Sequence, residues 1–355
     1  MKQLLSILLL LFSTPFVYGD YPDEYPVYLQ YLGFSKDEIR GLASGSIVTH
    51  SLENKLPGEI GFTVAKVIHV PPYYFRDYYT AIENFKSVLE FRQIGKFKQV
   101  PDSQDLEALQ LSSQELQELV ACRPQQCELK LSSTEISFIP HNADIGTDAG
   151  KQDVANAYKK ILLDRLISYQ KDGISGIGVY EDSVPSTTPA TTISAQALRL
   201  PHLAGYFPVA KKYLMEYPAH KNTFTPEFFF WAKESWGKKP VITIHHVFSQ
   251  RVGKDYVLIK NLIYASHYFV SSIGVLHLIN YSDSASPGTL LVEQNRILTD
   301  LKGSTLPAIG RNFLAANMQE NLLSLIQHLS NSTETRYSSR FYMGFPYNLP
   351  PTDQR

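Results

Sequence analysis

The chain has 355 residues, of which 44% are hydrophobic and 12% aromatic, so it can bury a large core in one or two domains. Its 33 Lys and Arg residues nearly balance its 34 Asp and Glu residues and leave a net charge of −1 at pH 7. This balance gives no electrostatic basis for binding nucleic acid or an anionic membrane surface, although local charged patches stay open, and we predict no nucleic-acid partner.

The N-terminal end has the three parts of a secretory signal peptide. Met1-Lys2 supplies a positive start, residues 4–12 form an apolar core, and Val17-Tyr18-Gly19 precedes a cleavage position, so the mature chain is expected to begin at Asp20. The apolar run is shorter than the roughly 20 residues of a membrane-spanning helix, and no later stretch reaches that length. The sequence therefore predicts a signal peptide over 1–19 and a secreted or periplasmic protein without a transmembrane segment after cleavage.

A short helix and two strands are expected next. Ser35-Lys36-Asp37-Glu38 has the spacing of a capping box and predicts a helix to about Leu42. Residues 46–52 and 59–70 have the composition of strands. Pro71-Pro72 then predicts the first turn of a helix, because proline fits that position and aromatic residues follow at helical spacing.

Residues 102–238 are predicted to form a large helical insert. Ser112-Ser113-Gln114-Glu115 is a second capping box, for a helix through Val120, and an apolar period predicts a helix from about Asp153 to Gly173. The other elements that we predict in and before the insert are an extended stretch over 88–100, a short strand over 128–131, an extended loop over 183–192, and helices over 195–204, 208–217 and 225–237, the last rich in aromatic residues.

The chain has two cysteines, Cys122 and Cys127, separated by a proline-containing turn. In an oxidising compartment such a pair is most simply a disulfide. A redox motif would have two intervening residues rather than four, and a metal site would need further ligands nearby. We therefore predict a Cys122–Cys127 disulfide.

From Lys239 to Leu301 the sequence predicts four strands in succession. β-Branched and aromatic residues fill 241–248, 257–265, 268–279 and 289–297, with turn residues between them. Short connections between consecutive strands mean an antiparallel meander.

A helix is expected to follow, over residues 309–329, with the tail over 331–355 loosely ordered. Spacings of three and four residues place one apolar stripe on this helix, formed by Leu314, Met318, Leu322, Leu325 and Leu329. We expect the stripe to lie on the sheet, with Gln319 and Gln327 away from it.

The order of these elements resembles the helix-grip arrangement of the START and polyketide-cyclase superfamily. The amino-acid sequence also resembles that of a family of secreted bacterial proteins with no established activity, over most of residues 40–329. The segments that carry this second resemblance are Val70-Pro71-Pro72, Ile82 to Lys86, Ile94 to Phe97, Cys122 to Cys127, Phe230 to Glu234, Lys239 to Ile242 and Ile263 to Phe269.

The helix-grip resemblance implies an α+β fold in a single domain over residues 20–330. An antiparallel sheet would grip the long C-terminal helix, with a cavity between them that in START-like proteins commonly takes sterols, lipids or other apolar molecules. The helical insert is larger than a minimal START-like domain carries, and it would either cover the cavity or fill it.

Aromatic residues and histidines near the meander are the candidate ligand-binding residues. Apolar cavities are lined by such side chains together with a few polar groups. We therefore predict a binding protein for an apolar, lipid-like molecule, with the site formed by Trp231, His246, Phe248, Tyr264 and His267. A filled core or a protein-interaction surface would use the same residues, so both alternatives stay open.

The sequence offers little for catalysis. His245, His246, His267 and His277 lie on three adjacent predicted strands, but His245 and His246 point to opposite faces, and no metal motif is present, so we predict no metal site. The glycines of residues 173–178 fit neither a nucleophile elbow nor a cofactor-binding loop, so we predict no cofactor. The alternative function is a hydrolase- or cyclase-like enzyme with His246 or His267 and Tyr264 as acid–base partners.

Overall fold

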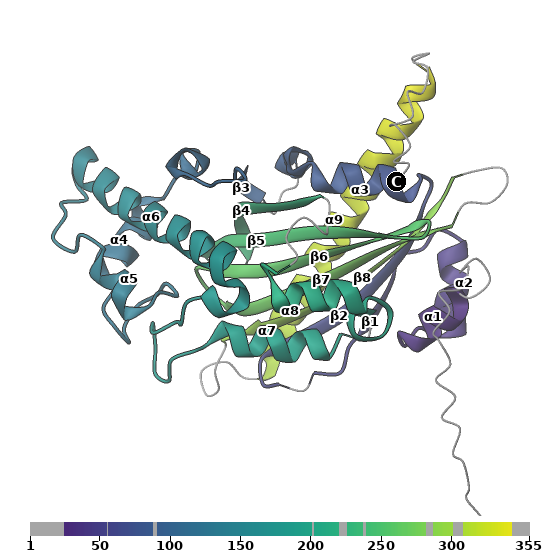
Figure 1. Cartoon of the computed structure of the whole chain (residues 1–355), viewed down its shortest axis with the longest axis horizontal. Helices are drawn as coiled ribbons and strands as arrows, with labels where there is room; N and C mark the ends of the chain where they lie inside the picture. Colours follow the sequence, from purple (N-terminus) through teal and green to yellow (C-terminus); the bar gives the residue numbers. More distant parts are fainter. Residues whose placement is uncertain are drawn as a thin grey trace, which may run out of the picture.

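The computed structural model describes residues 25–54, 56–87, 91–200, 202–219, 226–236, 239–281, 287–300 and 308–342. An antiparallel sheet in the order β1-β2-β8-β7-β6-β5-β4-β3 forms its middle layer (Figure 1). The strands are β1 (Val48–Ser51), β2 (Glu59–Ile68), β3 (Phe91–Lys96), β4 (Glu227–Trp236), β5 (Lys239–Val252), β6 (Asp255–Ala265), β7 (Phe269–Asn280) and β8 (Thr289–Thr299). The predicted signal peptide lies outside the described residues.

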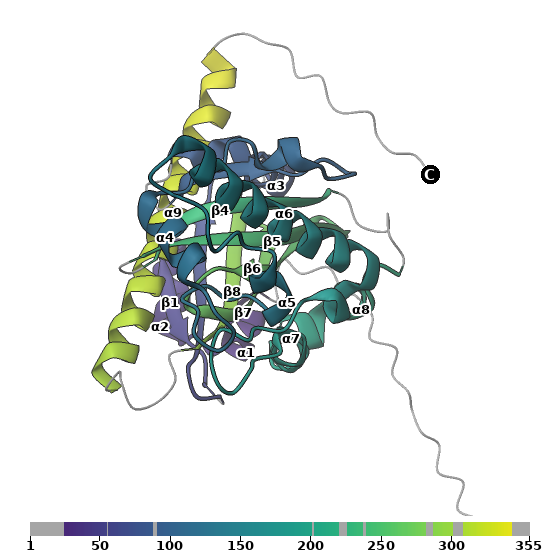
Figure 2. The same cartoon turned by 90° about the vertical axis from the view of Figure 1, so that its left-hand side faces the viewer.

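Helices cover both faces of the sheet, and Figure 2 shows α9 on one side and the group α5 to α8 on the other. The helices are α1 (Tyr25–Tyr31), α2 (Lys36–Ala43), α3 (Pro72–Thr80), α4 (Ser113–Ala121), α5 (Ser133–Ser137), α6 (Asp148–Asp172), α7 (Pro189–Leu198), α8 (Pro208–Glu216) and α9 (Ala308–Tyr342). Short 3-10 helices occur at Ile82–Ser87, Ser103–Leu106 and Gly173–Gly176, and a π-helical turn occurs at His202–Tyr206.

The fold class is α+β with a helix-grip arrangement, as predicted. Strands β5 to β8 are consecutive neighbours, β2 pairs antiparallel with β8, and α9 lies across one face of the sheet. The meander is antiparallel because its strands follow each other through short connections.

Two hydrophobic cores lie on opposite faces of the sheet. On the α9 face, Met318, Leu322 and Ile326 pack with α3 and with sheet residues such as Phe230 and Leu262. On the other face, helices α4 to α8 pack against a second set of sheet residues that includes Trp231. The helices of the insert therefore cover the face opposite the C-terminal helix, whereas β4, at the end of the predicted insert, belongs to the sheet and also contacts the α9 face.

The aromatic helix predicted over 225–237 is wrong, because residues Glu227–Trp236 form strand β4. Phe229 and Trp231 face the helical insert, and Phe228 and Phe230 face α9. A strand buried on both faces is apolar throughout, so it has no alternation that would distinguish it from a helix in the sequence.

The other helices predicted in the insert form, with shifted ends. Both capping boxes form as predicted, at Ser35 before α2 and at Ser112 before α4, and α6 ends at Asp172 with Gly173 as its C-cap. The short strand predicted over 128–131 is wrong, because this stretch forms no strand. The loop predicted over 183–192 is too long, since α7 begins at Pro189, which fits the first turn of a helix.

Helix α9 is longer than predicted and ends at Tyr342, so the prediction of a loose tail is wrong for residues 331–342. This extension packs on α3 through the rings of Tyr337 and Tyr74, whose centroids lie 4.9 Å apart, and through Arg340, which lies over Tyr74. Aromatic and cation–π contacts hold residues 331–342 against α3. These residues show no apolar period in the sequence, so the sequence did not predict that they continue the helix. Residues 343–355 lie outside the described part of the chain, and the predicted single domain over 20–330 stays a prediction.

The predicted stripe of α9 is confirmed only in part. Met318, Leu322 and Leu329 are buried against the sheet, whereas Leu325 is half-buried and Ile326 is buried in its place. The side chain of Leu314 lies outside the described set. The two glutamines expected off the stripe touch the sheet edge, because Gln319 donates to Thr49 at 2.8 Å and Gln327 accepts from Lys66 at 3.0 Å.

The predicted disulfide is confirmed: Cys122 and Cys127 are bonded across the turn that follows α4. Residues Arg123 and Gln126 exchange backbone hydrogen bonds inside the small loop. None of the helices in the described ranges is long and apolar enough to span a membrane.

Candidate functional site

A cavity lies between the sheet and α9, and we call it the α9 cavity. About 80 Å³ of it is open to the centres of water-sized molecules, and its empty space totals about 720 Å³ including the part open to solvent. A single water needs roughly 10–15 Å³ by the first measure, so this volume by itself holds several waters or a small organic group, and a longer molecule would extend into the part that is open to solvent. Its apolar lining consists of Phe62, Phe91, Trp236, Leu262, Phe269, Ile297, Met318, Leu322 and Leu325.

The polar lining of the α9 cavity comes mainly from alternate residues of the central strands. These side chains are Glu234, Thr243, His245, Lys260, Ser272, Asn295 and Asn321. They share one face because side chains at every second position of a strand point the same way.

A glycine in the middle of the sheet makes room for this polar group. In the sheet register Lys260 is opposite Gly274, and Gly274 is opposite Asn295. A Cβ atom on Gly274 would lie 2.7 Å from Oδ1 of Asn295, so any side chain there would displace Asn295. The absent side chain therefore leaves space for the amide of Asn295, whose Nδ2 donates to Glu293 at 2.8 Å.

Glu234 is the hydrogen-bond acceptor for three neighbours. Trp236 Nε1 donates to it at 2.7 Å, the Thr243 hydroxyl donates at 2.6 Å, and Nε2 of His245 lies 3.4 Å from Oε1. Burial raises the pKa of Glu234, but His245, Thr243 and Lys260 together outweigh burial and lower that pKa below its usual value. Glu234 is therefore a buried carboxylate held in its charged form.

His245 is held in its neutral form. Burial lowers its pKa, and the hydrogen bond and charge of Glu234 offset this only in part. A neutral His245 donates from Nε2 to Glu234, and the imidazole ring also stacks on Phe230 at a centroid distance of 4.8 Å.

Lys260 carries the positive charge of the α9 cavity. It also lines a smaller neighbouring cavity beside Tyr79 and Phe228, with about 320 Å³ of empty space. Burial works against the charge of Lys260, but electrostatic interactions with Tyr79, Glu293 and Glu234 outweigh burial and raise its pKa. Lys260 is therefore an ammonium ion at the junction of the two cavities.

None of the five residues predicted to bind a ligand lines the α9 cavity. Trp231, Phe248 and Tyr264 are at most 1% exposed and belong to the core beneath the helical insert. His246 is buried on the same face, with its Nδ1 atom 3.0 Å from the hydroxyl of Tyr169 and its Nε2 atom 3.4 Å from Glu227. These four residues lie on the face of the sheet opposite α9.

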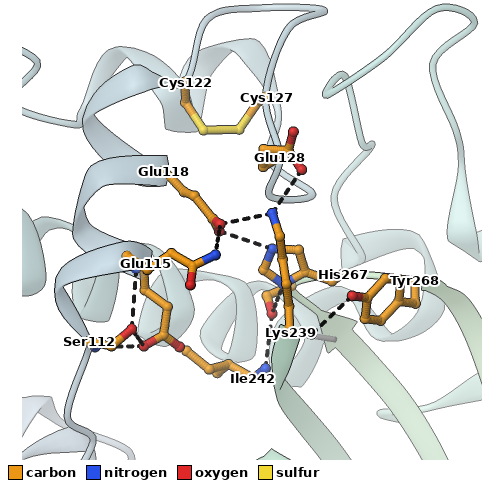
Figure 3. Close-up of polar contacts among 12 residues, drawn as sticks. Ser112, Glu115, Glu118, Cys122, Cys127, Glu128, Lys239, Ile242, His267 and Tyr268 are labelled. Atoms are coloured by element: carbon orange, nitrogen blue, oxygen red, sulfur yellow. Dashed lines mark hydrogen bonds and ion pairs between the residues drawn. A yellow bond between two sulfur atoms is a disulfide. The ribbon is translucent and has the colours of Figure 1, made fainter. Parts of the chain in front are cut away.

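His267 follows the end of β6 and joins the sheet to the insert (Figure 3). Its Nε2 atom lies 3.4 Å from Glu118 of α4, and its Nδ1 atom lies 2.8 Å from the hydroxyl of Ser266. Lys239 contacts the same carboxylate at 2.8 Å. Burial lowers the pKa of His267, and Glu118 offsets this in part. The network stabilises the packing of α4, beside the disulfide.

The acid–base pair of the alternative function, Tyr264 with His246 or His267, does not form as a hydrogen-bonded pair. Tyr264 shares a hydrogen bond of 3.0 Å with Tyr158, whereas His246 contacts Tyr169 and His267 contacts Ser266. Each of these residues therefore has a partner outside the predicted pair. Within the described ranges there is also no group of three His, Cys, Asp or Glu residues that could hold a metal ion.

Sequence reasoning missed Glu234, His245 and Lys260 as a group. The available signal was the alternation of β5, which places His245 and His246 on opposite faces. The sequence does not say which face α9 covers, so the choice between the two histidines needed the structure.

No model of a known protein family matches the sequence, and no curated protein matches it. Among solved structures, the Zhui aromatase/cyclase from Streptomyces sp. R1128 is similar with a TM-score of 0.27 and 12% identity, over 32% of this chain and 70% of that protein. A START superfamily protein from Mycobacterium smegmatis is similar with a TM-score of 0.23 and 13% identity, over 30% of this chain and 65% of that protein. Both are proteins of the START and aromatase/cyclase group, and both likenesses are too low and too partial to support a conclusion about function.

Proposed function

We propose that the protein binds a small, largely apolar molecule in the α9 cavity. The observation that supports this is the lining itself: nine apolar side chains surround a small group of polar ones between the sheet and the C-terminal helix. Binding sites for small molecules commonly combine an apolar wall with a few placed polar groups. An acid–base enzyme has less support, because the residues predicted for it have other hydrogen-bond partners.

The ligand contacts in this proposal are on the α9 face. Leu262, Met318 and Leu322 supply apolar contact, and Glu234, His245 and Lys260 supply the polar groups. The buried residues Trp231, His246, Phe248 and Tyr264 instead support the sheet from the other side.

Filling the cavity tests the proposal. Ser272 lines the cavity from β7, so Ser272→Phe places a ring where the ligand is expected. Native mass spectrometry of wild type purified from its own host is expected to show a bound small molecule that organic solvent extracts. We expect Ser272→Phe to lose most of this bound mass and to bind an apolar fluorescent probe about tenfold more weakly, since overlap of non-bonded atoms opposes binding.

The matched control is Ser113→Phe, which adds the same ring at an exposed position at the start of α4. It is expected to bind like wild type, and both variants are compared only if their melting transitions stay cooperative. A wild type that carries no bound molecule and gives no response to apolar probes contradicts the proposal.

We also propose that the protein acts outside the cytoplasm. The Cys122–Cys127 disulfide supports this, because disulfides persist in oxidising compartments. Mass analysis of the protein from the secreted or periplasmic fraction is expected to show a chain that begins at Asp20, no free thiol, and a peptide that links Cys122 to Cys127. Reduction is expected to cost only about 2 kcal/mol, because the closed loop is short. Two freely alkylated cysteines, or a chain that retains residues 1–19, would refute this assignment.

A further inference from the structure

The ammonium group of Lys260 is the cation in the lining of the α9 cavity, and among the described residues it lacks a hydrogen-bond acceptor. Within the described part of the chain, Lys260 makes no hydrogen bond and no ion pair within 4.0 Å. Its neighbours in the register are Val247 on β5 and Gly274 on β7, neither of which offers a polar side chain. A lysine in this position has up to three N–H donors available for a molecule in the cavity.

The nearby carboxylates already have neutral donors. Glu234 accepts hydrogen bonds from Trp236 and Thr243, and Glu293 accepts one from Asn295. Both carboxylates act on Lys260 through their charge at longer range. Lys260 thus lacks an acceptor, whereas Glu234 in the cavity lining and Glu293 beside it both have donors.

This arrangement discriminates between head groups of different charge. An anionic head group placed beside Lys260 would gain one attraction but would meet repulsion from two carboxylates in a partly desolvated site, where charge interactions are strong. A neutral oxygen would accept a hydrogen bond from Lys260 without adding charge. Hydrogen bonds with one charged partner contribute more than those between neutral groups.

We propose that the ligand of the α9 cavity is an apolar molecule with a neutral oxygen, a carbonyl or a hydroxyl, that accepts a hydrogen bond from Nζ of Lys260, and that molecules with an anionic head group at this position are rejected. This inference rests on the proposed function, since it names the class of ligand for the same cavity. It extends that function from general apolar binding to selection by head-group charge.

Three molecules of equal chain length test the inference on the wild-type protein: 1-decanol, 2-decanone and decanoate, each measured by displacement of an apolar fluorescent probe at neutral pH. We expect 1-decanol and 2-decanone to bind at least about tenfold more tightly than decanoate. Equal or tighter binding of decanoate overturns the inference and leaves the proposed function in place. If none of the three displaces the probe and the probe itself does not bind, both proposals fail.

Substitutions of Lys260 provide the second arm. Lys260→Met keeps the length of the side chain and removes its donors, so affinity for 1-decanol and 2-decanone is expected to fall about tenfold. Lys260→Arg keeps a charged donor and is expected to retain most of the affinity. The control is Lys254→Met, at an exposed position in the turn between β5 and β6, which is expected to behave as wild type. Unchanged affinity for both neutral ligands in a folded Lys260→Met also overturns the inference.

Discussion

Truncating Ile326 or Leu329 of α9 to alanine is expected to destabilise the protein by about 2–5 kcal/mol each, a large share of the roughly 5–15 kcal/mol that stabilises an ordinary domain. Both side chains are 2% exposed and pack in the core between α9 and the sheet. Neither lines the α9 cavity, so each truncation creates new empty space instead of enlarging an existing one. Thermal unfolding followed by circular dichroism measures the effect as a lower melting temperature.

Two further substitutions on α9 show whether burial is the cause. Leu325→Ala removes a half-buried side chain that already borders the cavity, so it is expected to cost clearly less than Ile326→Ala. Ser324→Ala changes the exposed position just before them and is expected to leave the melting temperature nearly unchanged. If Ser324→Ala and Ile326→Ala melt alike, α9 does not stabilise the fold by packing on the sheet.

Replacing Lys233 by methionine is expected to cost about 3–5 kcal/mol, because it leaves Glu115 as a buried charge without its cation. Lys233 on β4 lies 2.6 Å from Glu115 of α4, and both side chains are at most 7% exposed. Lys233 also donates to the backbone oxygen of Gln110 at 2.9 Å. This ion pair connects the sheet to the helical insert, so urea unfolding of Lys233→Met is expected to shift to lower urea concentration.

A double substitution separates the buried charge from the loss of packing. Glu115 also closes the capping box of α4 by accepting from the backbone N–H of Ser112 at 2.6 Å, and a glutamine can keep that role. Lys233→Met with Glu115→Gln is therefore expected to recover a large part of the lost stability. Lys98→Met, which breaks an ion pair with Asp102 at a half-exposed site, is the control and is expected to change stability little. A double variant no more stable than Lys233→Met alone would show that the uncompensated charge is not the cause.

The local signals in the sequence predicted several elements accurately. The capping boxes at Ser35 and Ser112 begin helices α2 and α4, because the side-chain hydrogen bonds that start a helix depend only on residues three positions apart. The meander β5 to β8 was predicted for a similar reason, since β-branched runs separated by turn residues are local features. The disulfide belongs to the same class, because its cysteines are close in the chain.

What the tertiary structure decided was which face of each strand meets which helix. Strand β4 carries Phe228 and Phe230 toward α9 and Phe229 and Trp231 toward the insert, and so its sequence lacks the alternation of a half-buried strand. The same choice of face separates His245, which lines the α9 cavity, from His246, which is buried under α6 and α8. The sequence by itself determined that these two histidines lie on opposite faces, since side chains alternate along a strand. Only long-range packing decided which face α9 covers, because two helical layers compete for two apolar faces and contacts between residues far apart in the chain select between them.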